Sequence, residues 1–105
     1  METSIDLYHF NTQKAKYMGH YFYGCSSLIS LDLSYFDTGN ILYMDGMFQF
    51  CSSLSEINLS NFNVVNAKDL SWMFANCTSL TSIDLSTFNT KKNTNINYMF
   101  TVVLI

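Results

Sequence analysis

Arginine and proline are both absent from this 105-residue chain, and charged residues of any kind are scarce. Only 12 % of the residues are charged, the five basic residues are all lysine, and the net charge is -3. Without arginine the chain lacks the planar guanidinium group that forms bidentate hydrogen bonds with phosphates and base edges. We therefore expect no nucleic-acid binding. The lack of proline argues against stiff linkers, and the 49 % of hydrophobic residues argue against disorder.

Long apolar runs are lacking as well. No uninterrupted apolar stretch approaches the ~20 residues that span a bilayer, so we expect no membrane insertion by this segment. The opening METSIDLYHF has no basic stretch followed by an apolar one, so the sequence predicts no signal peptide. The four glycines form no Gly-rich phosphate loop.

What the chain does contain is one 26-residue pattern, repeated about four times. Shifting the sequence by 26 positions aligns nearly every large apolar residue into columns. The clearest column is Cys25, Cys51 and Cys77. The other columns are Leu28, Leu54, Leu80; Ile5, Leu31, Ile57, Ile83; Leu7, Leu33, Leu59, Leu85; Phe10, Phe36, Phe62, Phe88; Met18, Met44, Leu70, Ile96; Tyr21, Met47, Met73, Met99; and Phe22, Phe48, Phe74, Phe100. The pattern predicts one domain over residues 1–105, with repeats at approximately 1–24, 25–50, 51–76 and 77–105, either whole or a fragment of a longer array.

Local spacing within a repeat predicts its secondary structure. Leu31 and Leu33 alternate with polar residues, which is the period of a strand with one buried face. Met44, Met47 and Phe48 have the i, i+3, i+4 spacing of one short helical turn that faces inward.

Gly24 and Asn76, just before the cysteine column, are residue types that suit a left-handed turn closing such a helix. Phe50 occupies the same place in the second repeat and interrupts this pattern.

Energetics favours stacking of the repeats. Burial of about eight side chains in one repeat contributes roughly 2 kcal/mol each. This does not offset the loss of backbone conformational entropy on ordering 26 residues, which costs about 1–2 kcal/mol per residue. Stacked repeats bury each column against its neighbours. The predicted fold is therefore an α/β repeat solenoid of the leucine-rich-repeat-like type. It has one parallel β-sheet with one short strand per 26-residue coil, and short helical or irregular arcs opposite.

The segments CSSLISLDLSYFDTGNILYMDGMFQFC, CSSLSEINLSNFNVVNAKDLSWMFANC and CTSLTSIDLSTFNTKKNTNINYMF resemble the BspA-like leucine-rich repeats, in particular the DUF285, Mycoplasma-lipoprotein-type branch. The resemblance covers about residues 5 to 100, and the first repeat departs from the motif at His9, Ala15 and Tyr21. It implies a leucine-rich-repeat-like solenoid in cell-surface or secreted proteins that adhere to host proteins or other cells. It also implies that there are no catalytic residues to assign.

The three cysteines match no zinc-ligand spacing, because they are odd in number and 26 residues apart. Neighbouring repeats bring two cysteines within disulfide range, but parallel side-chain directions give a poor torsion. We therefore interpret them as small, buried core residues.

A second column, Asp6, Asp32, Asn58 and Asp84, falls on the exposed face of the predicted strands. A solvated polar ladder is the favoured interpretation. A weak Ca²⁺ site is an alternative, since carboxylates and hydroxyls suit that cation. The pair Asp6 and Asp32 also has the spacing of a retaining glycosidase, but nothing in the sequence desolvates either acid. His9 and His20 have no nucleophile or acid that can be paired with them from sequence, and are interpreted as surface residues.

Six aromatic residues fall outside the core columns, and exposed tyrosine and tryptophan are common at interfaces. They either contact a partner or cover neighbouring coils. They are Tyr17, Tyr23, Tyr35, Tyr43, Trp72 and Tyr98.

The sequence thus predicts a non-enzymatic binding protein that contacts a protein or cell-surface macromolecule through a concave sheet, with no catalytic residues, no metal and no cofactor. The alternatives are a structural spacer within a longer array, with end-to-end self-association, and a weak cation-binding solenoid. The predicted contact residues are Ser30, Asp32, Ser34, Tyr35, Glu56, Asn58, Ser60, Asn61, Ser82, Asp84, Ser86 and Thr87.

Overall fold

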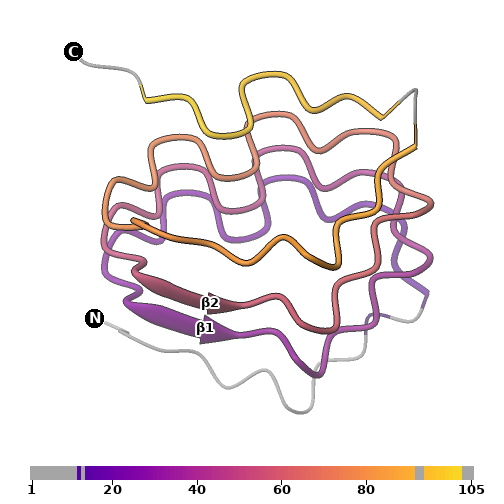
Figure 1. Cartoon of the computed structure of the whole chain (residues 1–105), viewed down its shortest axis with the longest axis horizontal. Helices are drawn as coiled ribbons and strands as arrows, with labels where there is room; N and C mark the ends of the chain where they lie inside the picture. Colours follow the sequence, from indigo (N-terminus) through magenta and orange to yellow (C-terminus); the bar gives the residue numbers. More distant parts are fainter. Residues whose placement is uncertain (1–11, 13, 92–93, 103–105) are drawn as a thin grey trace.

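Two short parallel strands, β1 (Ser30–Asp32) and β2 (Glu56–Asn58), form one open sheet. The computed structural model describes residues 12, 14–91 and 94–102, and none of these is helical. The strands pair with Leu31 opposite Ile57, so each residue lies beside the one 26 positions later. Figure 1 shows β1 and β2 side by side, with the matching stretch of the next repeat alongside them.

Strand formation stops after β2, which lies in the third repeat. The prediction of one strand per repeat is confirmed for β1 and β2 and is wrong for residues 82–84, which form no strand. Side chains link the fourth repeat to the third on this side: Ser79 Oγ donates to the Ser52 carbonyl at 2.7 Å, and Thr87 Oγ1 donates to the Leu59 carbonyl at 3.0 Å. The expectations for Ile5, Asp6, Leu7, His9 and Phe10 lie outside the described residues.

A second line of parallel contacts runs between repeats, through the single-residue bridges Tyr17↔Tyr43, Tyr43↔Asp69 and Asp69↔Asn95. Beyond each bridge the backbone amides alternate between two kinds of acceptor. Gly46 N–H donates to the Ser71 carbonyl of the next repeat at 2.8 Å, whereas Met47 N–H donates back to the Met44 carbonyl at 3.3 Å. A helix needs every amide to bond within its own segment. The predicted helical turn at 44–48 is therefore wrong, because alternate amides serve the neighbouring repeat.

Left-handed backbone recurs at two columns of the repeat along this second line of contacts. The left-handed conformation predicted for Gly24 and Asn76 is confirmed, with φ of 72° and 59°, although neither residue closes a helix. Phe50 does not break the pattern as expected, because it adopts φ of 64° despite its bulky side chain. The second left-handed column, at φ between 59° and 62°, is His20, Gly46, Trp72 and Tyr98.

The apolar columns point inward and form one continuous core. Met44, Met47 and Phe48 are each 0 % exposed, so their inward orientation is confirmed although they are not helical. Phe48 stacks between Phe22 and Phe74, with ring centroids 5.5 and 5.3 Å away. At roughly 2 kcal/mol per buried side chain, these columns supply most of the stabilisation.

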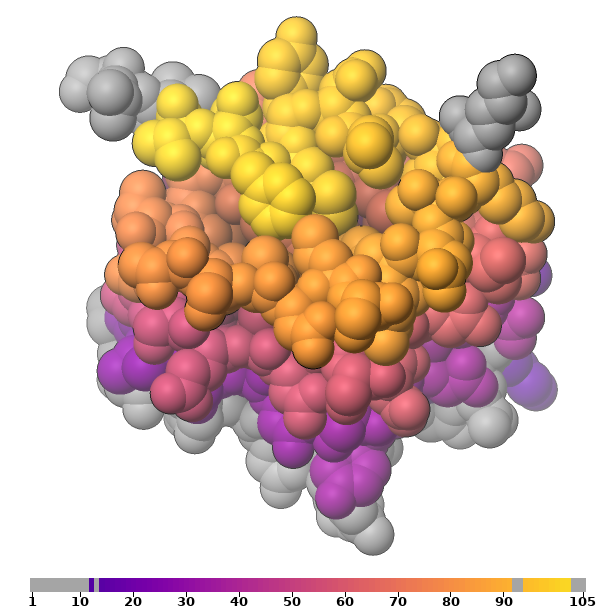
Figure 2. Space-filling view, in the orientation of Figure 1, coloured from indigo at the N-terminus to yellow at the C-terminus, as the bar shows by residue number. Residues whose placement is uncertain are grey.

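The last described repeat packs against the core on one side, and its other side is exposed to solvent. Ile96 and Phe100 are 52 % and 49 % exposed, although they belong to columns that are buried in the inner repeats. Tyr21 also departs from its column and is largely exposed. Figure 2 shows the repeats as successive bands of colour in a molecule that measures 32 × 31 × 22 Å. The described residues contain no helix that is long and apolar enough to cross a bilayer.

Candidate functional site

The predicted contact face carries an exposed polar row across the sheet. The pairing of β1 with β2 sets Ser30 beside Glu56 and Asp32 beside Asn58. Asp32, Glu56 and Asn58 are exposed, while Leu31 of the same strand is buried, as period-two alternation requires. The fourth repeat continues the row with Ser82 and Asp84, both exposed.

The Asp/Asn column has a local structural role. Asp32, Asn58 and Asp84 each accept, through Oδ1, the backbone N–H of the serine two residues later, at 2.9, 3.0 and 2.9 Å. Such Asx turns hold the chain where it leaves the sheet. The hydroxyl and backbone N–H of Ser34 lower the pKa of Asp32, and those of Ser86, the backbone N–H first, lower the pKa of Asp84. These carboxylates are therefore ionised acceptors at neutral pH, held in a fixed direction.

Shallow hollows lie between successive repeats on this face, with volumes of about 440, 410 and 330 Å³. The predicted contact residues that border them are Ser30, Asp32, Glu56, Asn58, Ser60, Ser82, Asp84, Ser86 and Thr87. The other three, Ser34, Tyr35 and Asn61, lie beyond their rims, and Asn61 Nδ2 donates to the Ser34 carbonyl at 2.7 Å. The residues described contain no cluster of three His, Cys, Asp or Glu side chains that could hold a metal.

The cysteines are core residues, as predicted. All three thiols are free, Cys51 and Cys77 are buried, and Cys25 is partly buried. Cys51 Sγ donates to the Phe22 carbonyl and Cys77 Sγ to the Phe48 carbonyl, each at 3.1 Å. Burial raises the pKa of Cys51 to about 12 and that of Cys77 to about 11. Thiols in this state are poor nucleophiles and poor metal ligands.

Four of the six aromatic residues that fall outside the core columns stack in pairs between repeats. Tyr17 and Tyr43 stack with centroids 5.1 Å apart and planes within 3°. Trp72 and Tyr98 stack at 4.7 Å. Each pair consists of residues 26 apart, so the rings cover one another between repeats, while Tyr17 and Tyr98 remain 73 % and 62 % exposed.

His20 is a surface residue, as predicted, but it has close neighbours. Its Nδ1 lies 3.9 Å from Asp45 Oδ2, and its ring lies 5.3 Å from the ring of Tyr23. The His20 side chain is 55 % exposed, so this contact is weak. No nucleophilic side chain accompanies it among these contacts.

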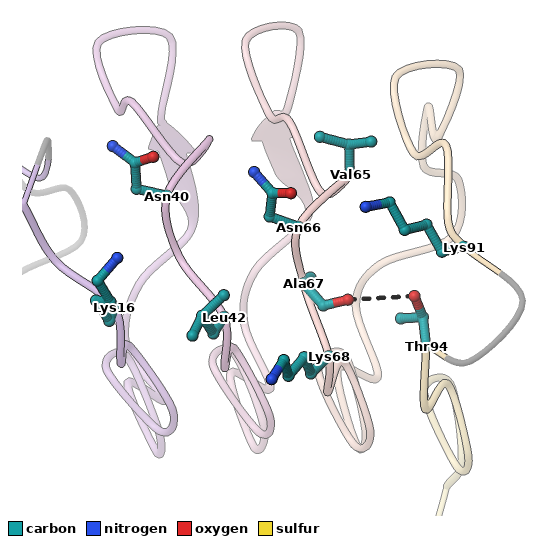
Figure 3. Close-up of a pocket in the computed structure, with 9 residues that line it drawn as sticks. All are labelled: Lys16, Asn40, Leu42, Val65, Asn66, Ala67, Lys68, Lys91 and Thr94. Carbon is teal, nitrogen blue, oxygen red and sulfur yellow. Dashed lines mark hydrogen bonds between the residues drawn. The ribbon is translucent and has the colours of Figure 1, made fainter.

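Sequence reasoning missed a second hollow, which shares no lining residue with those on the sheet. It is a groove of about 400 Å³ with Lys16, Lys68 and Lys91 among its lining residues (Figure 3). Lys16 and Lys68 lie two repeat lengths apart and so occupy one column, which is the signal that could have found it.

Comparison with known proteins gives one match. Residues 1–103 match a family described as "Mycoplasma protein of unknown function, DUF285". No curated protein matches the chain, and no solved structure matches it.

Proposed function

We propose that this chain, which belongs to the DUF285 family, is a non-enzymatic protein that binds a macromolecular partner, most simply another protein, through the exposed face of its sheet. On this proposal the 26-residue units form a leucine-rich-repeat-like solenoid of the BspA type. The partner lies across several units, and each unit contributes a few weak contacts.

The polar row of the sheet face is the observation that carries the proposal. Asp32, Glu56 and Asp84 are exposed side chains from three consecutive units, and hollows of about 330 to 440 Å³ lie among them. Recognition by aligned side chains on a rigid repeated surface is the usual mode of solenoid proteins. The fixed Asx turns add to this, because side chains that are already ordered lose little entropy on binding.

The proposed setting is the cell surface or the extracellular space, with adhesion as the role. This part of the proposal is supported by the resemblance of the repeat segments to BspA-like proteins, and is an analogy between families.

A selection experiment tests the proposal. Peptides are selected from a displayed random library on the immobilised chain, and binding is then measured to a sheet variant, Glu56→Ala/Asn58→Ala/Ser60→Ala. The matched control replaces three exposed polar residues that border none of the sheet hollows and do not line the lysine groove, Ser26→Ala/Ser52→Ala/Asn97→Ala. We expect the sheet variant to lose about ten-fold or more in affinity. Equal binding by both variants would refute the proposal.

A structural spacer within a longer array is the second candidate. Its support is the apolar surface of the last described repeat, where Ile96, Phe100 and Val102 are 52 %, 49 % and 53 % exposed. Such a surface fits another unit of the same kind. Sedimentation velocity and thermal melting across a concentration series test it: self-association with a melting temperature that rises with concentration supports it, and a monomer with a constant melting temperature rejects it.

A further inference from the structure

Positive charge is confined to a small part of this acidic chain. All five lysines fall within residues 14–16, 68 and 91–92. The sheet face, in contrast, carries Asp32, Glu56 and Asp84. The chain as a whole is negatively charged, with a net charge of -3, but the region that carries the lysines is positively charged.

The groove introduced above concentrates this charge. Figure 3 shows that Lys16, Lys68 and Lys91 reach its walls from three different repeats. All three are exposed at the surface. Lys16 and Lys68 belong to one column and are separated by one intervening repeat, whose residue in that column is Leu42. The repeat geometry therefore sets the spacing of the two backbone positions that carry Lys16 and Lys68 along the groove.

Carboxylates of the described chain do not neutralise these lysines. The single ion pair among the described residues joins His20 and Asp45. Asp69, which follows Lys68 in the chain, accepts the backbone N–H and the hydroxyl of Ser71 through Oδ1, at 2.9 and 2.6 Å. Among the described residues, therefore, no carboxylate pairs with the ammonium groups of Lys16, Lys68 and Lys91.

The floor of the groove is partly apolar, formed by Leu42, Val65 and Ala67. Val65 is 38 % exposed, so the floor is open to a ligand. Asn66 stands at the edge, where its Nδ2 donates to the Gly39 carbonyl of the preceding repeat at 2.8 Å. The Thr94 hydroxyl donates to the Ala67 carbonyl at 3.2 Å (Figure 3), which ties the last repeat to this wall.

We propose that this groove binds an acidic peptide segment in an extended conformation, as a second interaction surface distinct from the sheet face. Glutamate or aspartate side chains on one face of the extended segment pair with Lys16 and Lys68, and apolar side chains two positions along, on the same face, rest on Leu42 and Val65. A peptide fits better than a polyphosphate or sulfated chain for two reasons. Such chains offer nothing to an apolar floor, and arginine, the residue suited to bidentate phosphate recognition, is absent.

The test uses a fluorescent peptide of about ten residues, long enough when extended to cross the groove. Every second residue, on one face of the extended chain, is alternately glutamate and alanine, and serine fills the positions between them. The same peptide with glutamine in place of each glutamate is its uncharged counterpart. We expect the glutamate peptide to bind the full chain at low salt, and the glutamine peptide to bind at least about ten-fold more weakly. Fluorescence anisotropy measures both.

Lysine variants then locate the site. Lys16→Gln and Lys68→Gln each weaken binding of the glutamate peptide by about two- to five-fold. The control Lys14→Gln removes the same charge from a described lysine that does not line the groove, and leaves binding within the error of the measurement. Far-ultraviolet circular dichroism checks that each variant is folded.

Three results would overturn the proposal. One is no binding of the glutamate peptide, and another is equal loss in all three variants, which indicates general charge attraction. The third is tighter binding of heparin or single-stranded DNA than of the peptide, with the same dependence on Lys16 and Lys68, which assigns the groove to a polyanion of another class.

Discussion

The rings of Phe22 and Phe48 stack with centroids 5.5 Å apart and planes within 3°, although the two residues are 26 positions apart in the chain. Phe48 is 0 % exposed and also stacks on Phe74. Replacing it with alanine, Phe48→Ala, removes the middle of this stack. We expect the free energy of unfolding, measured by urea titration, to fall by about 3–5 kcal/mol.

Phe100 supplies the matched control, since it occupies the same column at the open side of the core. Its ring is 49 % exposed and stacks on Phe74 at 5.6 Å. Phe100→Ala should lower the free energy of unfolding by about 1–1.5 kcal/mol, since roughly half of the ring is already in water. Equal losses for the two variants would contradict the described order of the repeats.

The cysteines give a prediction about chemical reactivity. With pKa values of about 12 and 11, Cys51 and Cys77 are almost wholly protonated at pH 8. Both are also buried, whereas Cys25 is partly exposed. Iodoacetamide should label Cys25 in the folded chain and label the other two only after denaturation. Rapid labelling of Cys51 in the folded chain, detected by peptide mass spectrometry, would contradict its burial.

Acid should weaken the Asx turns of the sheet face. The pKa values of Asp32 and Asp84 are lowered from 3.8 in the folded chain. Their contribution to stability is therefore present above pH 3.8 and is lost as the pH falls through the lower, folded values. Both carboxylates are exposed, so we expect a small effect.

Asn58 makes the same turn without a titrating group, accepting the Ser60 N–H at 3.0 Å. The double variant Asp32→Asn/Asp84→Asn should therefore keep its turns. As the pH is lowered from about 5 to about 2.5, its melting temperature should fall by less than that of the wild type. Identical pH profiles would show that these hydrogen bonds do not contribute to acid stability.

Gly46 has a left-handed backbone that a side chain would strain. Its φ is 62°, and an added Cβ would lie 2.7 Å from Nε2 of His20. Gly46→Ala should cost about 1–2 kcal/mol in the free energy of unfolding. Gly39→Ala is the control, because Gly39 has no positive φ and its nearest neighbouring atoms lie 3.5 Å away. A melting temperature unchanged in Gly46→Ala would contradict the backbone assignment.

The core could be predicted because the apolar residues recur every 26 positions and most residues of these columns are buried. Leu31, Leu33 and Phe48 lie inward as their columns indicated. The predicted helical turn around Met47 failed for a physical reason that a single repeat does not reveal. Alternate amides, such as that of Gly46, donate to the next repeat, and this pattern depends on a neighbour at fixed spacing. The i, i+3, i+4 spacing of apolar residues is compatible with either arrangement.

The left-handed residues were predicted only in part. Glycine and asparagine adopt positive φ readily, so Gly24 and Asn76 could be identified. Trp72 and Phe50 could not, because neither residue type favours that conformation and stacking between repeats imposes it. The lysine groove was missed for another reason: Lys16 and Lys68 share a column, but Leu42 stands between them in that column and interrupts the charge pattern.

The central claim is that equivalent residues of the 26-residue units lie side by side, so that one unit can replace another. Deleting one whole unit, residues 51–76, joins Phe50 to Cys77 and keeps every column in register. Deleting residues 51–70 removes fewer residues but shifts all later columns.

Thermal melting of these two deletion variants, followed by far-ultraviolet circular dichroism, is the most direct test. The account predicts a cooperative melt for the 26-residue deletion, at a lower temperature than that of the wild type, and no cooperative melt for the shorter deletion. The opposite ranking, or two equally folded variants, would contradict the stacking of equivalent columns.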